Sequence, residues 1–290
     1  MAVDATYYTD PACPWAYSAW PALSVLRWRY RDQLRWRLVT IGLADTPERY
    51  LRHHYTPARS AKAYRRLRRY GMPFATEPRA RIPATGLACR AIVATREGQP
   101  GREWDALRAL QFAWFTTTLV PDEHEEIAAA LRRFAGEVDA RAVLDAVDEP
   151  ATLDAYERDR AEARTAAGSP TEMQGKAAAT DGPVRYTAPS VIFASNGTRL
   201  EAGGFQPVEA YDVVVANLDP SLERRGPASD PAEALREFPA GLVTQEVAAI
   251  MAGNNESADR AAAEDALIEL AGEGTVRRLA LGDDALWRLA

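Results

Sequence analysis

Hydrophobic and polar positions at the start of the chain follow two different periods. Residues 3–9 are short and β-prone, and Asp10-Pro11 interrupts them. From residue 14 to about residue 31, apolar and aromatic side chains recur at helical spacing, and over residues 34–41 they alternate as in a strand. A strand, a helix and a second strand predict a β-α-β unit, whose two strands a right-handed crossover can make parallel.

The next clear strand patterns occur much later in the chain. Residues 190–194 and 198–202 read as strands, and Asn196-Gly197 between them is a strong signal for a tight hairpin turn. Residues 207–218 then have the spacing of a helix. The second β part is therefore expected to be a hairpin followed by a helix.

Helical patterns dominate between these two β parts. They run over residues 84–95, 103–119, 125–134, 140–147 and 152–167. We interpret this region as a helical block inserted into a small α/β domain.

The C-terminal part begins with a change of composition. Residues 219–241 are rich in Pro, Arg and Ser, which predicts a linker with at most a short helix. After it, Thr244 is expected to cap a helix, an acid-rich helix follows over residues 258–272, and the last residues alternate around Gly282-Asp283 as a hairpin. Two helices and a hairpin are the outline of a winged helix.

These patterns divide the chain into four expected parts. A discontinuous α/β domain covers residues 1–45 and 184–220, and a helical domain covers residues 46–183. A linker over residues 221–240 leads to a winged-helix-like unit over residues 241–290.

Composition excludes several classes of protein. Of 290 residues, 47% are hydrophobic and 26% charged, which excludes wholesale disorder and a coiled-coil rod. The formal net charge is -6, so a nucleic-acid partner would need a local basic patch. No run approaches the ~20 apolar residues that span a membrane, and the first residues lack the pattern of a secretory signal. We expect a cytoplasmic protein with no membrane partner.

Cysteine and histidine are scarce, which limits the chemistry. Two cysteines cannot build a disulfide framework, and with three histidines they offer no usual zinc site, so no metal is expected. Cys13 lies at the start of the first helix, with Pro14 just inside it. A helix N-terminus stabilises a thiolate, so Cys13 is a candidate nucleophile of lowered pKa. The alternative is a small buried hydrophobic residue that happens to begin a helix.

A family resemblance rests on this turn. YYTDPACPWAY resembles the active-site turn of the DsbA family, and within it the FrnE-like branch, whose pattern is D-P-x-C-P-W-C. Thr187-Ala188-Pro189, just before a predicted strand, lies where that fold carries a cis-proline loop facing the cysteine. The resemblance covers about residues 3–218 and implies a thioredoxin fold with a large inserted helical domain. It also implies catalytic residues, Cys13 and Pro189, and active-site neighbours, namely Pro14, Trp15, Ala16, Thr187 and Ala188.

One position departs from the family pattern. Dithiol members have a resolving cysteine three residues after the nucleophile, and here that residue is Ala16. Three options stay open: Cys89 resolves a mixed disulfide, a small thiol such as glutathione or mycothiol does so, or the protein has left redox cycling. Kappa-class glutathione transferases and 2-hydroxychromene-2-carboxylate isomerases share the architecture and work with one residue at this turn, typically serine, and a bound thiol.

Several secondary signals have competing interpretations. Cys89 lies in a helical run of small and apolar residues, which favours core packing. Trp15 either limits access to the Cys13 sulfur or simply packs. One predicted helix collects basic side chains that could hold an anionic thiol or an acidic partner, although a solvated surface is favoured; they are Arg59, Lys62, Arg65, Arg66, Arg68 and Arg69.

The would-be recognition helix of the C-terminal unit is acidic. It carries Asp259, Glu264, Asp265 and Glu269. Because phosphates would be repelled, DNA binding is not expected, and we interpret the unit as a docking or dimerisation element. A homodimer is one form this could take.

Two functions from different classes follow. The leading one is a cytosolic thiol oxidoreductase or thiol transferase that uses Cys13 alone on a small-molecule or protein thiol. The alternative is a redox-inactive thioredoxin-fold adaptor that acts through its winged-helix-like unit. The pKa of Cys13 discriminates between them, because an adaptor has no need of a thiolate at neutral pH.

Overall fold

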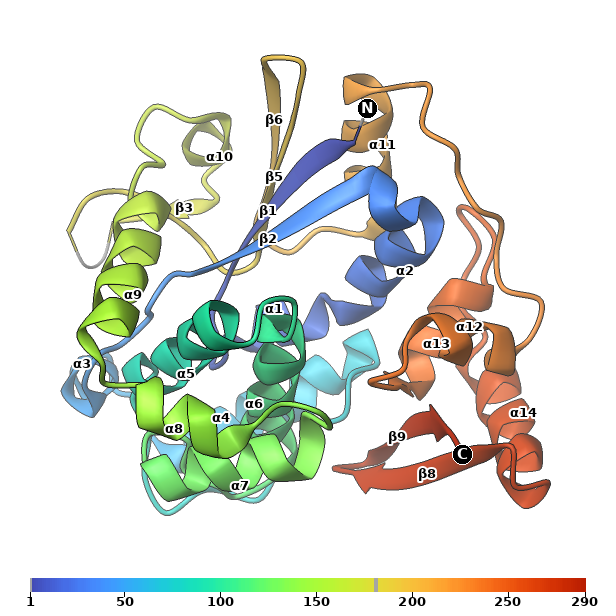
Figure 1. The fold of residues 1–290 in the computed structure, drawn as a ribbon, viewed down its shortest axis with the longest axis horizontal. Coiled ribbons are helices and arrows are strands. Elements are labelled where there is room, and N and C mark those ends of the chain that lie inside the picture. Colours follow the sequence, from blue (N-terminus) through green and yellow to red (C-terminus); the bar gives the residue numbers. More distant parts are fainter. Residues whose placement is uncertain (1, 180–181) are drawn as a thin grey trace.

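The computed structural model of the chain describes residues 2–179 and 182–290, and it begins with the predicted β-α-β unit (Figure 1). Strand β1 (Val3–Thr9) pairs in parallel with β2 (Leu34–Thr40). The helix between them is divided into α1 (Pro14–Ser18) and α2 (Trp20–Tyr30). Pro21 accounts for the division, because a proline has no N–H to donate to the carbonyl four residues earlier.

The predicted hairpin completes the central sheet. Strands β5 (Ser190–Ser195) and β6 (Thr198–Gly203) are antiparallel, and both turn residues, Asn196 and Gly197, have positive φ, as a two-residue hairpin turn of type I′ requires. Strand β5 also pairs antiparallel with β1, which gives the order β2-β1-β5-β6. Helix α11 (Val208–Leu218) contacts the hairpin and α2. The fold is α/β, with a thioredoxin-like sheet.

The five helices predicted between the two β parts are all present, with ends that differ by a few residues. The predicted basic helix is also present, as α4, whereas the short helices α3 and α10 and two strands of only two residues were not predicted, because short segments leave no periodic pattern. In chain order the region contains α3 (Pro47–Arg52), α4 (Pro57–Leu67), α5 (Gly86–Gly98), α6 (Glu103–Thr116), α7 (His124–Phe134), α8 (Ala140–Ala146), α9 (Pro150–Ala163), α10 (Pro170–Met173), β3 (Ala177–Ala178) and β4 (Arg185–Tyr186). No described helix has the length and apolar character needed to cross a bilayer.

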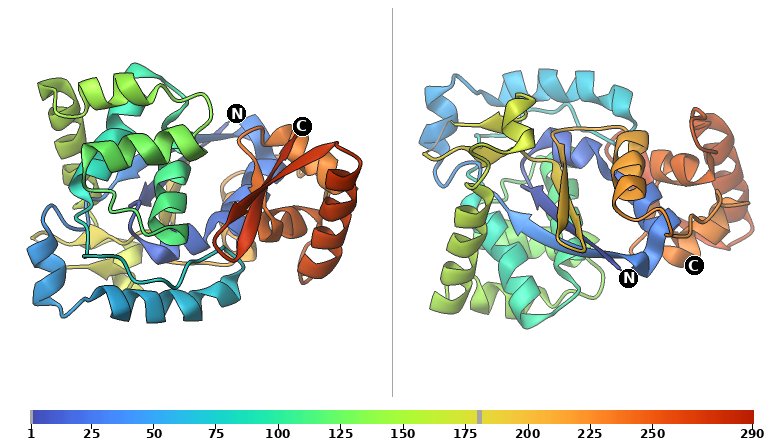
Figure 2. Two further views of the ribbon diagram at one scale, coloured as in Figure 1. Left: turned by 90° about the horizontal axis from the view of Figure 1, so that it is seen from below. Right: turned by 90° about the horizontal axis from the view of Figure 1, so that it is seen from above.

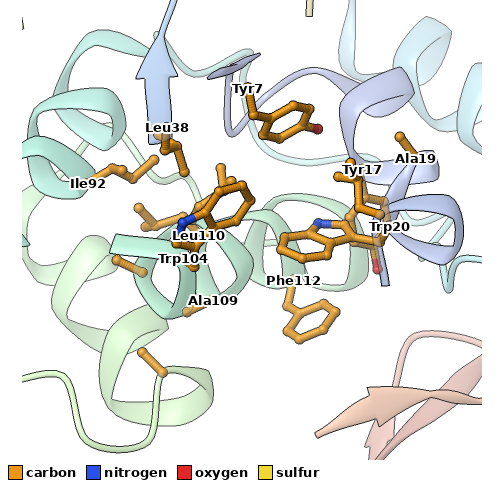
Figure 3. Close-up of a cluster of buried hydrophobic side chains, with 14 of the residues drawn as sticks. Tyr7, Tyr17, Ala19, Trp20, Leu38, Ile92, Trp104, Ala109, Leu110 and Phe112 are labelled. Atoms are coloured by element: carbon orange, nitrogen blue, oxygen red, sulfur yellow. The ribbon is translucent and has the colours of Figure 1, made fainter. Parts of the chain in front are cut away.

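The main core joins the sheet to the inserted helices (Figure 3). The Tyr7 ring on β1 stacks on Trp104 of α6 with centroids 5.7 Å apart, and Trp20 of α2 meets the same indole edge to face. Tyr17 stacks on Phe115 at 4.7 Å. These large buried rings join the helical block to β1, α1 and α2.

The C-terminal part contains the predicted helices and hairpin. In chain order it consists of α12 (Pro231–Glu237), β7 (Leu242–Val243), α13 (Thr244–Met251), α14 (Arg260–Gly272), β8 (Val276–Leu281) and β9 (Asp284–Leu289). One prediction is wrong: Thr244 does not cap α13, because its buried hydroxyl donates to Asp284 (2.6 Å) and accepts from Trp287 Nε1 (2.9 Å). The Thr244 hydroxyl therefore bonds side chains that are distant in sequence instead of the first amides of its own helix.

This C-terminal unit packs on α2. Val25 and Trp28 of α2 belong to the same buried cluster as Val247 and Trp287. Figure 2 shows the unit (red) and the helical block (green) on opposite sides of α2. The segment expected to be a linker also contacts α2, because Trp28 Nε1 donates to the Gly226 carbonyl (2.8 Å).

A buried ion pair joins the C-terminal unit to the helical block. Arg108 of α6 forms a bidentate bridge to Glu246 of α13, with Nη1 and Oε1 2.7 Å apart. Ser24 of α2 donates to the same carboxylate at 2.8 Å. One carboxylate therefore links three parts of the fold.

Candidate active site

Cys13 occupies the turn between β1 and α1, at the N-cap of the helix. Its amide donates to the Asp10 carbonyl (3.1 Å), and Pro14 takes the first helical position. The Cys13 side chain is only 6% exposed. Cys13 therefore lies at a helix N-terminus, as predicted. It is nevertheless buried, although turns usually lie at the surface.

The loop before β5 meets this cysteine across the fold. The Ala188–Pro189 peptide bond is cis, and the Cys13 thiol donates to the Ala188 carbonyl at 3.0 Å. The Thr187 hydroxyl instead donates to the Lys176 carbonyl at 2.6 Å. Of the three loop residues, Ala188 thus makes the direct contact with the sulfur.

The expectation of a lowered pKa for Cys13 is wrong in this structure. Burial raises the pKa of the Cys13 thiol to about 12, and the Asp10 carboxylate adds to the rise. The Ala16 and Trp15 amides at the helix start lower it, but by less. The helix N-terminus and the loop that faces it can be recognised in the sequence, whereas the depth to which the sulfur is buried cannot.

Asp10 is a residue of this site that sequence reasoning missed. Its carboxylate is fully buried and accepts from the Ala12 amide (2.9 Å) and the Leu43 amide (2.8 Å). The Cys89 thiol donates to the same carboxylate at 3.5 Å. Burial raises the pKa of Asp10. The one signal in the sequence is its position, directly before Pro11 and the cysteine turn.

Cys89 lies inside the molecule rather than at a surface. It is fully buried on α5 in a cluster with Val93, Ala155 and Tyr156, and burial raises the pKa of its thiol. Both cysteines are free. These surroundings are those of a core residue, with one added polar contact to Asp10.

A cavity of about 570 Å³ opens beside Cys13. Trp15, 41% exposed, lies at this cavity and packs against Tyr70 and Phe205 with ring centroids 5.6 Å and 5.5 Å away. Most of the remaining wall is aromatic or apolar. Its aromatic members are Tyr50, Tyr55, Tyr64 and Trp114.

The same cavity has a basic wall. Arg66 and Arg69 reach it from the basic helix predicted in the sequence, and Arg79 and Arg81 come from the following loop. Arg81 is neutralised by Asp122 at 2.6 Å. Glu77 also lines the cavity, but within the described residues no carboxylate forms an ion pair with Arg66 or Arg69.

The histidines are placed at the surface. His53 and His54 are exposed, and His124 pairs with Asp148 at 2.8 Å. Among residues 2–179 and 182–290, no three His, Cys, Asp or Glu side chains are grouped so that they could hold a metal.

Three solved structures share this fold at low sequence identity. A putative protein disulfide isomerase from Nitrosomonas europaea is 16% identical over 75% of this chain and 97% of its own, with a TM-score of 0.55. A probable DsbA oxidoreductase from Streptomyces coelicolor is 18% identical over 78% and 93%, with a TM-score of 0.54. The cytosolic disulfide reductase DsbM from Pseudomonas aeruginosa, also solved with GSH, is 18% identical over 75% and 100%, with a TM-score of 0.52.

Sequence comparison gives a more specific result. No curated protein matches the chain significantly. A family model described as the DSBA-like thioredoxin domain matches residues 5–184, which include β1, the Cys13 turn and the helical block. Because this match spans more than half of the chain and agrees with the fold, the protein belongs to the DSBA-like thioredoxin domain family.

Proposed function

We propose that the protein is a thiol oxidoreductase or thiol transferase in which Cys13 is the lone nucleophile. The observation that carries this proposal is the meeting of three features at one sulfur. Cys13 is the N-cap of α1, it faces the Ala188–Pro189 loop, and it lines an open cavity. Pro189 and Ala188 would hold a substrate segment or a small thiol against the sulfur.

The reaction we infer is thiol–disulfide exchange in two steps. The deprotonated Cys13 sulfur attacks one sulfur of a disulfide, the S–S bond breaks, a mixed disulfide forms on Cys13, and the departing thiolate takes up a proton. The Trp15 and Ala16 amides favour the attacking thiolate. A second thiol then attacks the mixed disulfide and releases Cys13.

The second thiol would come from solution, because Ala16 cannot supply it. Glutathione or mycothiol is the class we propose, and of the two it is glutathione whose carboxylates Arg66 and Arg69 would attract. The solved DsbM structure with GSH supports this choice by analogy of fold. Cys89 is the competing source, and its full burial argues against it.

Location and domain organisation belong to the same proposal. We place the protein in the cytoplasm. We propose that residues 241–290 form a winged-helix-like unit, joined through residues 221–240, that serves docking rather than DNA binding.

A second function is favoured by one observation. A thiol whose pKa is raised to about 12 is almost wholly protonated at neutral pH, as in a redox-inactive adaptor. Such an adaptor would act through the C-terminal unit.

One assay separates the two functions. Reduction of hydroxyethyl disulfide by glutathione is measured with the native chain, Cys13→Ser and Cys89→Ser. The enzyme proposal expects activity in the native chain and in Cys89→Ser, none in Cys13→Ser, and a Cys13–glutathione adduct by mass spectrometry. No activity and no adduct in the native chain would establish the adaptor.

A further inference from the structure

A second cavity lies between α2, α6 and the C-terminal unit, away from Cys13. Its volume is about 430 Å³, and none of its lining residues lines the cavity at Cys13. Trp20 and Trp104 contribute to its wall, and their edge-to-face contact is visible in Figure 3. The cavity is thus formed only where the C-terminal unit meets the rest of the chain.

Four arginines and three acidic residues, Asp105, Glu137 and Glu237, line this cavity. The guanidinium groups that line it belong to Arg27, Arg102, Arg108 and Arg288. Two of them have carboxylate partners, since Arg108 is bridged to Glu246, and Arg102 to Glu137 and Asp105.

Glu237, the third acidic residue in the wall, pairs with arginines outside the cavity. Glu237 pairs with Arg31 at 3.2 Å and Arg225 at 2.9 Å, and neither of these arginines lines the cavity. Each lining carboxylate is therefore already engaged by another arginine.

Two guanidinium groups remain without a carboxylate among the described residues. Arg27 of α2 lies over the Trp104 ring, 5.2 Å from its centroid, with no ion pair. Arg288 of β9 donates only to backbone carbonyls, to Ala240 at 3.0 Å and Phe134 at 2.9 Å. Burial and the charge of Arg108 lower the pKa of both groups, while the Asp105 carboxylate acts on both in the opposite direction.

We propose that this cavity binds a small phosphate ester, whose dianionic group lies between Arg27 and Arg288. Two partly buried cations with no carboxylate in direct contact are unfavourable, and a doubly charged oxyanion would pair with both. The planar fork of arginine matches phosphate oxygens in two-point hydrogen bonds. The volume leaves room for an organic group beside the two indoles. Because α2 and β9 supply the two cations, the ligand would bridge α2 and the C-terminal unit.

Thermal unfolding of the full chain tests this site. Glycerol phosphate and inorganic phosphate are titrated at constant ionic strength against sodium chloride and succinate. We expect a saturable rise in Tm with both phosphates that neither control produces, because a ligand of the native state shifts unfolding by mass action. A rise that does not saturate, or one matched by chloride or succinate, would overturn the proposal.

Variants assign the effect to the two arginines. Arg27→Gln and Arg288→Gln should each weaken phosphate binding at least about tenfold, the scale expected for loss of one charged, two-point contact. Arg27→Lys keeps the positive charge but loses the planar guanidinium. Its phosphate affinity should lie between those of the native chain and Arg27→Gln. The matched control is Arg277→Gln, which removes one charge from an exposed position of the neighbouring strand β8. If one variant folds too poorly for this comparison, ³¹P spectra of phosphate are recorded with the native chain and with Arg27→Lys. The native chain should broaden the phosphate signal more than Arg27→Lys does. Unchanged binding in the cavity variants would refute the site.

Discussion

At the scale of single residues, two influences oppose each other at the Cys13 sulfur. The helix N-terminus favours the thiolate by about 1 kcal/mol, which is a typical effect of a helix end. Burial acts the other way and is the larger influence, since the pKa of Cys13 rises to about 12. The thiol proton is shared with the Ala188 carbonyl. A substrate that displaces this carbonyl contact and brings in polar groups would shift the balance towards the thiolate.

We predict that iodoacetamide alkylates Cys13 faster than Cys89 at any pH, because only Cys13 lines a cavity. Since the pKa of Cys13 is raised, little thiolate exists at neutral pH, and the rate should rise about tenfold per pH unit without a plateau below pH 10. Peptide mass spectrometry of Cys13→Ser and Cys89→Ser measures each thiol alone. A plateau near pH 7 would show that the sulfur has the lowered pKa of a typical helix-end cysteine, and faster labelling of Cys89 would contradict the nucleophile assignment.

Ala16→Cys should give the protein insulin-reductase activity. The new thiol would stand one helical turn from Cys13 and could resolve a mixed disulfide within the chain. Turbidity of reduced insulin measures the gain. Ala19→Cys is the control, because it adds a buried thiol to the same region two turns from Cys13. Equal activity in both variants would argue against resolution from position 16.

The residues of this site were predictable in unequal degree. Cys13 and Ala16 stand in one local motif, so a single turn of sequence identifies them. The contact between Asp10 and Cys89 joins positions 79 apart and depends on how α5 packs, which no local pattern encodes.

At the scale of elements, long periodic segments were predicted well. Helices α5 to α9 and the hairpin β5–β6 each repeat a period often enough to be recognised. The short helix α3 and the strand β7 are too brief for that, and β7 forms by pairing with β9. The same dominance of tertiary contacts explains why Thr244 does not serve as a cap.

The link between α6 and α13 should be sensitive to charge. Glu246→Gln leaves the Arg108 guanidinium buried without its counter-charge, so we expect the free energy of unfolding to fall by about 3 kcal/mol. Urea unfolding measures it. Asp145→Asn breaks the exposed Arg141–Asp145 pair and should cost less than about 0.5 kcal/mol. A similar small loss in both variants would mean that the buried pair contributes little.

Helix α14 should not support binding to duplex DNA. Asp265 and Glu269 are exposed on it, and Arg260 is engaged by Asp284 at 3.2 Å. Phosphates approaching this helix would meet negative charge. The full chain should therefore give no mobility shift with duplex DNA at about 0.15 M salt. A shift that weakens as salt increases would contradict this electrostatic argument.

At the scale of the whole molecule, the C-terminal unit shares the main core. Val243, Leu281 and Leu286 belong to the same buried cluster as Tyr17 and the sheet. We therefore expect one cooperative unfolding transition. Hydrogen exchange should give the slowest amides of β9 and β1 the same free energy of opening. Exchange of β9 through a separate, lower-energy opening would show that the unit unfolds independently.

The two-sided burial of α2 has a consequence for protein engineering. Leu23 and Leu26 face the main core, while Val25 and Trp28 face the C-terminal cluster. A designer who transplanted the thioredoxin-like part alone would create an apolar surface patch, and with it a risk of aggregation. Transplanting this part alone would require polar replacements at Val25 and Trp28, so the thioredoxin-like part of this chain is not self-contained.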